Sequence, residues 1–330
     1  MERGKRFYVP YILLVTCALV LFTILSRSMF QPEFEKSCGW EFVSYVPSSL
    51  ERTWLVHADD WGEEPCQHVA QFSELVASWL EFIKNPKIRS KEYIVPAAMS
   101  RFTYRNVCDP REKIVVPIEP LFGPLRNPEI CKGVDFVDRS YIYIDWQLPA
   151  AFARQRSHQP RKSHYFDLGA STWTSGAGAA SQNWIVHEYE RRGIFFDGIW
   201  AWESTVYEPN QVWDQIPERY VPAYHWFNIP AEADEHSRWN PLNILARVAS
   251  KEDFVVLKID IDNSTVENRF LSQIRSNKTL QSLIDEMYFE PHFKMNPLQQ
   301  FWGSQTIPFK DVITLLSDLR TAGIRIHGWI

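Results

Sequence analysis

The chain has 330 residues, enough for one large domain or two smaller ones. Its net charge of −5 argues against nucleic-acid binding as the main activity, because a phosphate-binding surface requires an excess of basic residues. Aromatic residues make up 15% of the chain, which fits a fold with large aromatic surfaces that are buried or face sugars.

The first 30 residues do not have the pattern of a globular domain. Tyr11–Leu25 is an apolar run without charge, and three basic residues precede it. The run is short for a spanning helix but suits a thin ER or Golgi bilayer, and the basic N-terminal side predicts a luminal body. We therefore expect a single-pass type II membrane protein of the ER or Golgi, anchored by residues 1–30. The alternative is a cleaved signal peptide, for which Ser26-Arg27-Ser28 is a poor cleavage site.

Four cysteines follow the apolar run, and all of them precede residue 151: Cys38, Cys66, Cys108 and Cys131. An even number suits an oxidising compartment and permits two disulfides, with the pairing left open. The alternative is four reduced structural cysteines. The chain has no C-x-x-C pair, which argues against a zinc ribbon.

Residues 31–150 are expected to form a stem and an N-terminal extension that packs on the domain after it. Gln67–Ile83 has apolar residues at helical spacing, which predicts a helix. Ile114–Arg126 contains three prolines and must be extended or looped. Tyr141–Trp146 has the composition of a strand.

Residues 151–330 alternate between strand patterns and helix patterns. Strands are expected at Tyr165–Leu168, Gly198–Glu203, Ala223–Asn228, Asp253–Asp262, Asp285–Glu290 and Ile324–Trp329. Helices are expected at Gln182–Arg192, Pro241–Ala249, Val266–Ser276 and Phe309–Ala322, with a helical or irregular piece at Pro209–Arg219. This alternation predicts an α/β domain with a doubly wound, mostly parallel, Rossmann-like sheet and helices on both faces.

Acidic residues gather where the expected strands end. In such a sheet, ligands bind beyond the carboxyl ends of the strands. Strand, glycine turn, helix, strand and acid follow one another from Ser163 to Glu203, which is the layout of a nucleotide-binding βαβ unit. A single acid here could equally be a helix cap, but several strands ending in acids indicate a site, because buried carboxylates are costly without partners. The residues at these ends are Asp167, Gly169, Glu203, Asp260, Asp262, Glu290 and His292.

These positions resemble motifs of the FkbM-type S-adenosylmethionine-dependent methyltransferases. The similar segments are Asp167-Leu168-Gly169-Ala170-Ser171, Glu203, Lys258-Ile259-Asp260-Ile261-Asp262 and Glu290-Pro291-His292, within Lys162–Ile330. The resemblance implies a class I methyltransferase fold with S-adenosylmethionine as the cofactor. It further implies that the cofactor is bound by Asp167, Gly169, Ala170, Ser171, Glu203, Asp260 and Asp262, with Glu203 on the ribose hydroxyls. The second glycine that is usual in the first turn is replaced here by Ser171-Thr172-Trp173.

Methyl transfer from a sulfonium depends mainly on alignment and desolvation, and a base helps when the acceptor is a hydroxyl. We predict that His292 or Glu290 is this base; the alternative for His292 is a hydrogen-bonded core histidine. Lys258 lies inside a strand, so an ion pair with a neighbouring carboxylate is favoured over a catalytic role. This interpretation assigns no metal site.

The expected function is O-methylation of a glycan or another acceptor of the secretory pathway. One alternative is a Golgi type II glycosyltransferase, in which Asp260-x-Asp262 holds a divalent metal against a sugar nucleotide. That alternative explains the N-terminal anchor but not the Asp167–Glu203 unit. Another is a protein that retains the methyltransferase fold without catalysis, which the altered glycine turn suggests. The oligomeric state is left open.

Overall fold

The computed structural model describes residues 39–85, 94–133, 138–147, 161–176, 180–295, 299 and 305–329. All of them belong to one compact unit, Cys38–Ile330. The expected membrane segment Tyr11–Leu25 lies outside the described residues. Within the described ranges, no helix is both long enough and apolar enough to cross a membrane.

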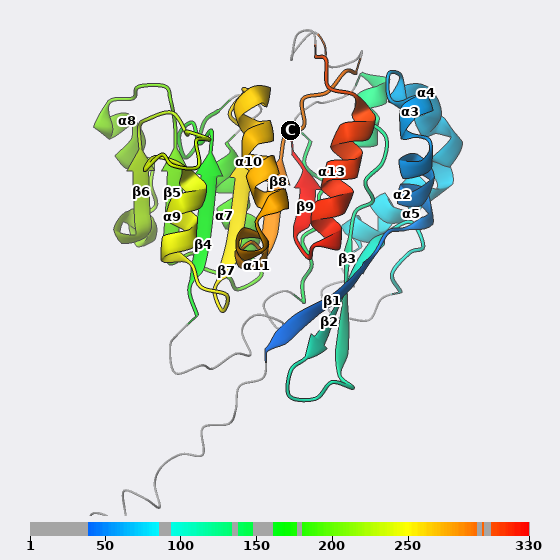
Figure 1. Cartoon of the computed structure of the whole chain (residues 1–330), viewed down its shortest axis with the longest axis horizontal. Coiled ribbons are helices and arrows are strands. Elements are labelled where there is room, and N and C mark those ends of the chain that lie inside the picture. The colour runs from blue at the N-terminus through cyan, green and yellow to red at the C-terminus, as the bar shows by residue number, and fades with distance from the viewer. Residues whose placement is uncertain are drawn as a thin grey trace, which may run out of the picture. The chain divides into compact units, whose positions relative to one another are not determined.

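A sheet of six parallel strands forms the larger part of this unit (Figure 1). The strands are β4 (Ser163–Leu168), β5 (Gly198–Trp202), β6 (Tyr224–Phe227), β7 (Phe254–Ile259), β8 (Glu286–Phe289) and β9 (Arg325–Gly328). Their order is β6-β5-β4-β7-β8-β9. Counted along the chain from β4, this is 3-2-1-4-5-6, the order of doubly wound nucleotide-binding sheets. The expected parallel α/β sheet is therefore confirmed.

Helices cover both faces of this sheet. In Figure 1, α9 (Pro241–Val248), α10 (Ser264–Ser276) and α13 (Phe309–Thr321) lie in front of it, and α7 (Ser181–Glu190) lies behind it. The described residues of this half also contain three short helices: α8 (Pro209–Trp213), η4 (Glu218–Ala223) and α11 (Lys278–Leu283). Of these three, α11 was not expected. Asn277 makes it possible, because its side chain caps the new helix by accepting from the backbone N–H groups of Thr279 and Leu280.

The N-terminal part contributes an antiparallel sheet and a group of short helices. Its strands are β1 (Trp40–Val46), β2 (Ser100–Asn106) and β3 (Lys113–Ile118), in that order. Its helices are α2 (Ser49–Val56), α3 (Ala58–Trp61), α4 (Pro65–Val69), η1 (Ala70–Phe72), α5 (Ser73–Lys84) and η3 (Pro128–Lys132). The helix expected at Gln67–Ile83 is thus present as consecutive pieces. Ile114–Arg126 is extended and then irregular, as its prolines predicted.

The strand predicted at Tyr141–Trp146 is wrong. This segment is irregular, although its first five side chains are buried. Its backbone groups pair with side chains instead of a neighbouring strand: the N–H of Tyr143 donates to Glu119 Oε2 at 3.0 Å, and the carbonyl of Ile144 accepts from Arg192 Nε at 3.0 Å. An apolar run whose polar backbone groups find such partners can be buried without joining a sheet.

Buried charges tie the N-terminal part to the parallel sheet. Arg320 on α13 is fully buried, forms an ion pair with Glu51 at 3.1 Å and donates to the carbonyl of Glu119 at 2.9 Å. The ring of His327 on β9 lies between two carboxylates, with Nδ1 2.7 Å from Glu119 Oε1 and Nε2 2.9 Å from Glu286 Oε1. Because each buried charge has a partner of opposite sign, the two parts are held in one fixed arrangement.

The expectation of disulfides is confirmed for three of the four cysteines. Cys66 in α4 is bonded to Cys131 in η3, 65 residues further along the chain. Cys108 is also disulfide-bonded. The Cys66–Cys131 bond fastens the short N-terminal helices to the irregular segment that follows β3.

Candidate functional site

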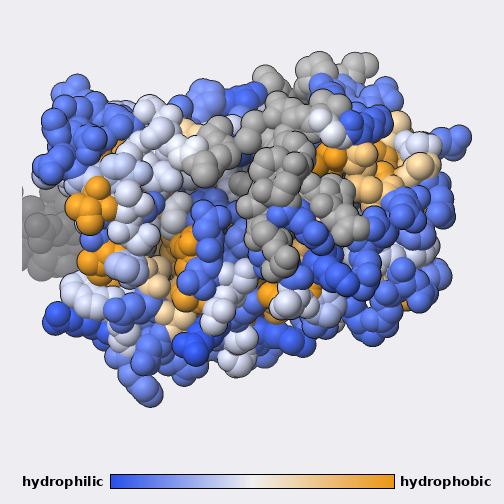
Figure 2. All heavy atoms as spheres, turned by 90° about the horizontal axis from the view of Figure 1, so that it is seen from above, coloured by the Kyte–Doolittle hydropathy of each residue, from blue (hydrophilic) through white to orange (hydrophobic). Residues whose placement is uncertain are grey.

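The carboxyl ends of β4 and β7 define the place where a ligand is expected. The order of the sheet reverses between these two neighbouring strands, and doubly wound folds bind ligands outside the strand ends at such a switch point. Figure 2 views the molecule from this end. The described surface there is mainly hydrophilic, with separate hydrophobic areas (Figure 2).

The turn after β4 is built on Gly169. Its φ of 82° is left-handed, a conformation that glycine adopts without steric cost. The N–H groups of Gly169 and Ala170 both donate to the carbonyl of Trp202, at 3.0 and 2.9 Å. A Cβ atom on Gly169 would lie 1.6 Å from the backbone oxygen of Asp260, so no other residue fits between the ends of β5 and β7. Ala170 is fully buried, and its carbonyl accepts from Gln182 on α7 at 2.9 Å.

Glu203, directly after β5, faces this turn. Its Oε2 accepts from the N–H of Ser171 at 2.8 Å, and its Oε1 accepts from the N–H of Thr205 at 2.6 Å. The side chain is 8% exposed. Each carboxylate oxygen can accept more than one hydrogen bond, so the acid fixes the loop and retains capacity for hydroxyl donors of a ligand. Ser171 itself has a left-handed φ of 51°, which is unusual for a residue with a side chain.

Lys258 connects two of the expected acids. It lies opposite Asp167 in the β4–β7 pair, and its Nζ is 3.2 Å from Asp167 Oδ1 and 3.0 Å from Asp260 Oδ2. The same Nζ donates to the carbonyl of Gly169 at 3.0 Å. Trp329 Nε1 donates to Asp260 Oδ2 at 3.1 Å. The ion pair expected for Lys258 is therefore present, and Asp167 is fully buried beneath the rim, not open to a ligand.

The ends of β7 and β8 bring Glu290 and His292 into a second group. Arg126, from the N-terminal part, donates to Glu290 Oε1. Glu290 Oε2 lies 3.3 Å from His292 Nε2. On the other side of the ring, Nδ1 is 3.3 Å from Ser264 Oγ and 3.6 Å from Glu267 Oε2. Asp262 is exposed and close to Glu290 and His292, with one ligand atom of each within 4.8 Å of the others.

Burial and neighbouring charges shift the proton affinities in these two groups. Burial raises the pKa of Asp260 to about 7, because the opposing attraction of Lys258 is offset by repulsion from Glu290. Burial disfavours the charged form of Glu290 as well, but hydrogen bonding to His292 and the charge of Arg126 outweigh it and lower its pKa. Burial would also lower the pKa of His292, but Glu290 and Glu267 raise it. A protonated acid next to an ionised one can divide proton donation and acceptance between them.

Four residues in these groups were missed from the sequence: Arg126, Ser264, Glu267 and Trp329. Trp329 stands at the end of an expected strand and Glu267 lies near the start of an expected helix. These positions are only a weak indication that the two residues belong to the site. For Arg126 there is no such indication, because it is 164 residues from its partner Glu290.

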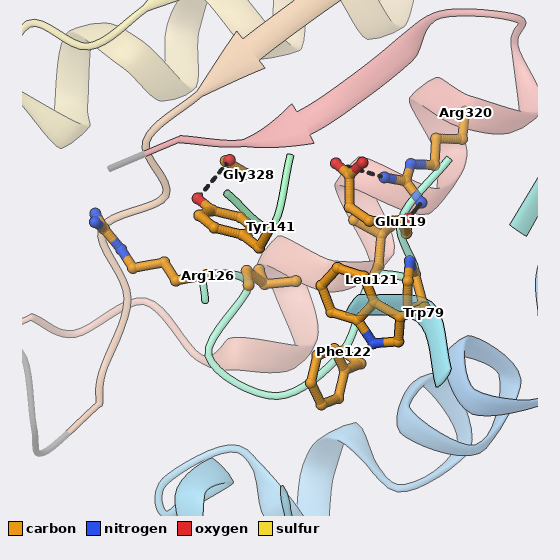
Figure 3. A pocket seen from close by; sticks show the side chains of 10 residues that line it. Trp79, Glu119, Leu121, Phe122, Arg126, Tyr141, Arg320 and Gly328 are labelled. Atoms are coloured by element: carbon orange, nitrogen blue, oxygen red, sulfur yellow. Dashed lines mark hydrogen bonds and ion pairs between the residues drawn. The ribbon is translucent and has the colours of Figure 1, made fainter. Parts of the chain in front are cut away.

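A small cavity lies elsewhere, between the N-terminal part and the end of β9 (Figure 3). Its lining includes Trp79, Phe122, Tyr141 and Arg320, and Tyr141 donates to the carbonyl of Gly328 at 2.9 Å. The cavity volume is about 10 Å³, the space of a single water molecule. This cavity is a packing gap and not a cofactor site.

Comparison with known proteins found no counterpart: no family model matches the sequence, and neither a curated protein nor a solved structure does. The functional conclusion therefore depends on the fold and on the side chains at the strand ends.

Proposed function

We propose that this protein binds S-adenosylmethionine at the carboxyl ends of β4, β5 and β7 and transfers its methyl group to an oxygen acceptor. The doubly wound order alone is shared with sheets that bind other nucleotide cofactors. The choice of cofactor rests on the resemblance of the Asp167–Ser171, Lys258–Asp262 and Glu290–His292 segments to FkbM-type methyltransferases.

The observation that carries the proposal is the contact between Glu203 and the loop after Gly169. An acid at the end of the second strand, held next to the glycine turn of the first, is the arrangement that binds ribose hydroxyls in nucleotide-binding βαβ units. The hydrogen bond from Ser171 N to Glu203 Oε2, at 2.8 Å, supports this role. Gly169 and Ala170 line the same turn, and Asp260 stands opposite them across the switch point.

The second group would serve the acceptor. Alignment of the acceptor oxygen with the methyl group supplies most of the rate acceleration, and removal of its proton supplies part of the remainder. Glu290 and His292 lie beside Asp260 and are the groups we expect to receive that proton. A glycan or another secretory-pathway molecule is the proposed acceptor, with the N-terminal segment as the membrane anchor of a luminal enzyme of the ER or Golgi.

The glycosyltransferase alternative is less well supported by the geometry. Asp260 Oδ2 forms an ion pair with Lys258 and accepts a hydrogen bond from Trp329. Asp260 and Asp262 therefore do not present two equivalent carboxylates to one ion. The non-catalytic alternative predicts the same cofactor contacts and differs from the proposal only in that no methyl group is transferred.

Calorimetric titration of the purified full-length chain tests the proposal. S-adenosylhomocysteine, NAD and a UDP-sugar with Mn²⁺ are titrated in parallel. Binding of S-adenosylhomocysteine alone is the expected result. Binding of the UDP-sugar with Mn²⁺, or of NAD, together with no response to S-adenosylhomocysteine, would reject the proposed cofactor.

A further inference from the structure

We propose that Asp262, Glu290 and His292 form a binding site for one divalent first-row metal ion. Ligand atoms of the three side chains lie within 4.8 Å of one another, and a combination of carboxylate oxygens and an imidazole nitrogen suits ions such as Mn²⁺ or Zn²⁺. This differs from the sequence interpretation, which assigned no metal. The inference does not depend on methyl transfer, since the ion would bind whether or not the cofactor does.

The spacing of the two buried ligands fits coordination. His292 Nε2 and Glu290 Oε2 are 3.3 Å apart. Two atoms that each bind an ion at about 2.1 Å, at angles between octahedral and tetrahedral, are separated by about 3.0–3.4 Å. Arg126 donates to the other oxygen of Glu290, Oε1, and so leaves Oε2 directed toward the histidine.

Glu267 provides a second observation, independent of the three ligands. It is 1% exposed, and its Oε1 accepts from the N–H of Ile261 at 3.0 Å. Its Oε2 has no hydrogen-bond partner among the described residues and lies 3.6 Å from His292 Nδ1. A carboxylate on the far nitrogen of a histidine is the common support of a metal ligand, because it holds the N–H on that nitrogen and leaves the other for the ion. In the structure Ser264 Oγ is the hydrogen-bond neighbour of Nδ1, at 3.3 Å, and Glu267 Oε2 lies just beyond hydrogen-bond distance, so a small approach of Glu267 to the ring would give it this role.

Charge and access also favour a cation. Asp262, Glu290 and Glu267 bring three carboxylates to the histidine, and the guanidinium of Arg126 forms an ion pair with one of them, Glu290. Lys258 is engaged with Asp167 and Asp260 and is not part of this group. Asp262 is exposed, so an ion can reach the buried ligands from solvent. With an ion bound, Glu290 and His292 would be its ligands and could not be the proton acceptors proposed above. The ion would instead act as a Lewis acid that lowers the pKa of an acceptor oxygen bound to it.

The test is a titration of the EDTA-treated, dialysed full-length chain with Mn²⁺, in which electron paramagnetic resonance measures free Mn²⁺. The wild type is expected to bind one equivalent. Asp262→Asn is the best variant, because the side chain is exposed, similar in shape, and compatible with the positive φ of 54° at this position. We expect its affinity to fall by at least ~10-fold, and Glu267→Gln to weaken binding by ~10-fold or more.

Asp214→Asn, which alters an exposed acid at the end of α8, is the control and is expected to bind as the wild type does. Failure of the wild type to bind an equivalent of Mn²⁺ would overturn the proposal. So would wild-type affinity in both Asp262→Asn and His292→Asn. Binding that is lost in Asp260→Asn and retained in His292→Asn would also overturn it, and would indicate an Asp260–Asp262 site instead.

Discussion

Lys258 and Asp167 are adjacent on β7 and β4 and are both fully buried, with Nζ and Oδ1 3.2 Å apart. This ion pair lies beneath the switch point and links β4 to β7 at the base of the candidate site. Replacing Lys258 by Met would leave a buried carboxylate without its cation, which typically costs 3–5 kcal/mol. Chemical unfolding should therefore show a free energy of unfolding lower by roughly 3 kcal/mol or more. Lys310→Met, which removes an exposed ion pair with Asp59, should leave stability unchanged. Equal stability of the two variants would contradict the structural role of Lys258.

Gly169 is expected to be irreplaceable because of close packing and not only because of its φ. Gly169 and Gly193 have nearly the same φ, 82° and 80°, but a Cβ on Gly193 would meet nothing within 4 Å. Gly193→Ala should therefore lose only about 1–2 kcal/mol of unfolding free energy, the cost of the left-handed conformation. Gly169→Ala adds the clash with the Asp260 carbonyl and should lose considerably more, or fail to fold. Similar losses in the two variants, measured by urea unfolding, would show that the close approach to Asp260 is absent.

Glu286 should contribute to acid stability. Burial disfavours its ionised form, but Arg325 and His327 outweigh burial and lower its pKa to about 2. A carboxyl whose pKa is lower in the folded state stabilises the protein above its unfolded pKa of 4.5 and loses this effect as the pH falls toward 2. Between about pH 5 and about pH 3.5, the wild type should lose about 1 kcal/mol more unfolding free energy than Glu286→Gln. The exposed variant Glu235→Gln should follow the wild type. A parallel course of Glu286→Gln and wild type would contradict this prediction.

The Cys66–Cys131 disulfide should stabilise the N-terminal part. It closes a loop of 65 residues, for which the loss of unfolded-state entropy corresponds to about 4 kcal/mol. The double variant Cys66→Ala/Cys131→Ala should unfold at a correspondingly lower denaturant concentration. If its midpoint matches that of the wild type, the bond does not constrain the chain as described.

Much of the parallel sheet could be predicted from the sequence, because short strand patterns alternate with helix patterns and turn signals from residue 162 onward. The central strand β7 was recognisable because all its positions except Lys258 are apolar. The N-terminal sheet was harder. In β2, Phe102 and Tyr104 point inward between Arg101, Thr103 and Arg105, an alternation that could have indicated a strand but is short and rich in charge. At Tyr141–Trp146 the opposite error occurred: a strand was predicted where the segment is irregular. The side-chain partners of its backbone groups cannot be inferred from composition.

The residues of the candidate site could be predicted as far as the ends of the strands could be predicted. Asp167, Glu203, Asp260, Asp262, Glu290 and His292 all stand where strands of one parallel sheet terminate, so their proximity follows from the topology. The topology does not show which of these acids form ion pairs with neighbouring cations. No sequence pattern indicates that Arg126 pairs with Glu290, or that Asp167 is the buried partner of Lys258, because those contacts depend on packing between distant segments.

The central claim is that a nucleoside cofactor binds against Glu203, and one measurement tests it most directly. The affinity of the full-length chain for S-adenosylhomocysteine is compared between wild type, Glu203→Ala and the exposed-acid control Glu235→Ala, with melting temperatures recorded for each. Loss of charged hydrogen bonds to the ribose should weaken binding by at least ~10-fold in Glu203→Ala, while Glu235→Ala binds as the wild type does. Equal affinity in all three proteins, or no binding to the wild type, would contradict the account.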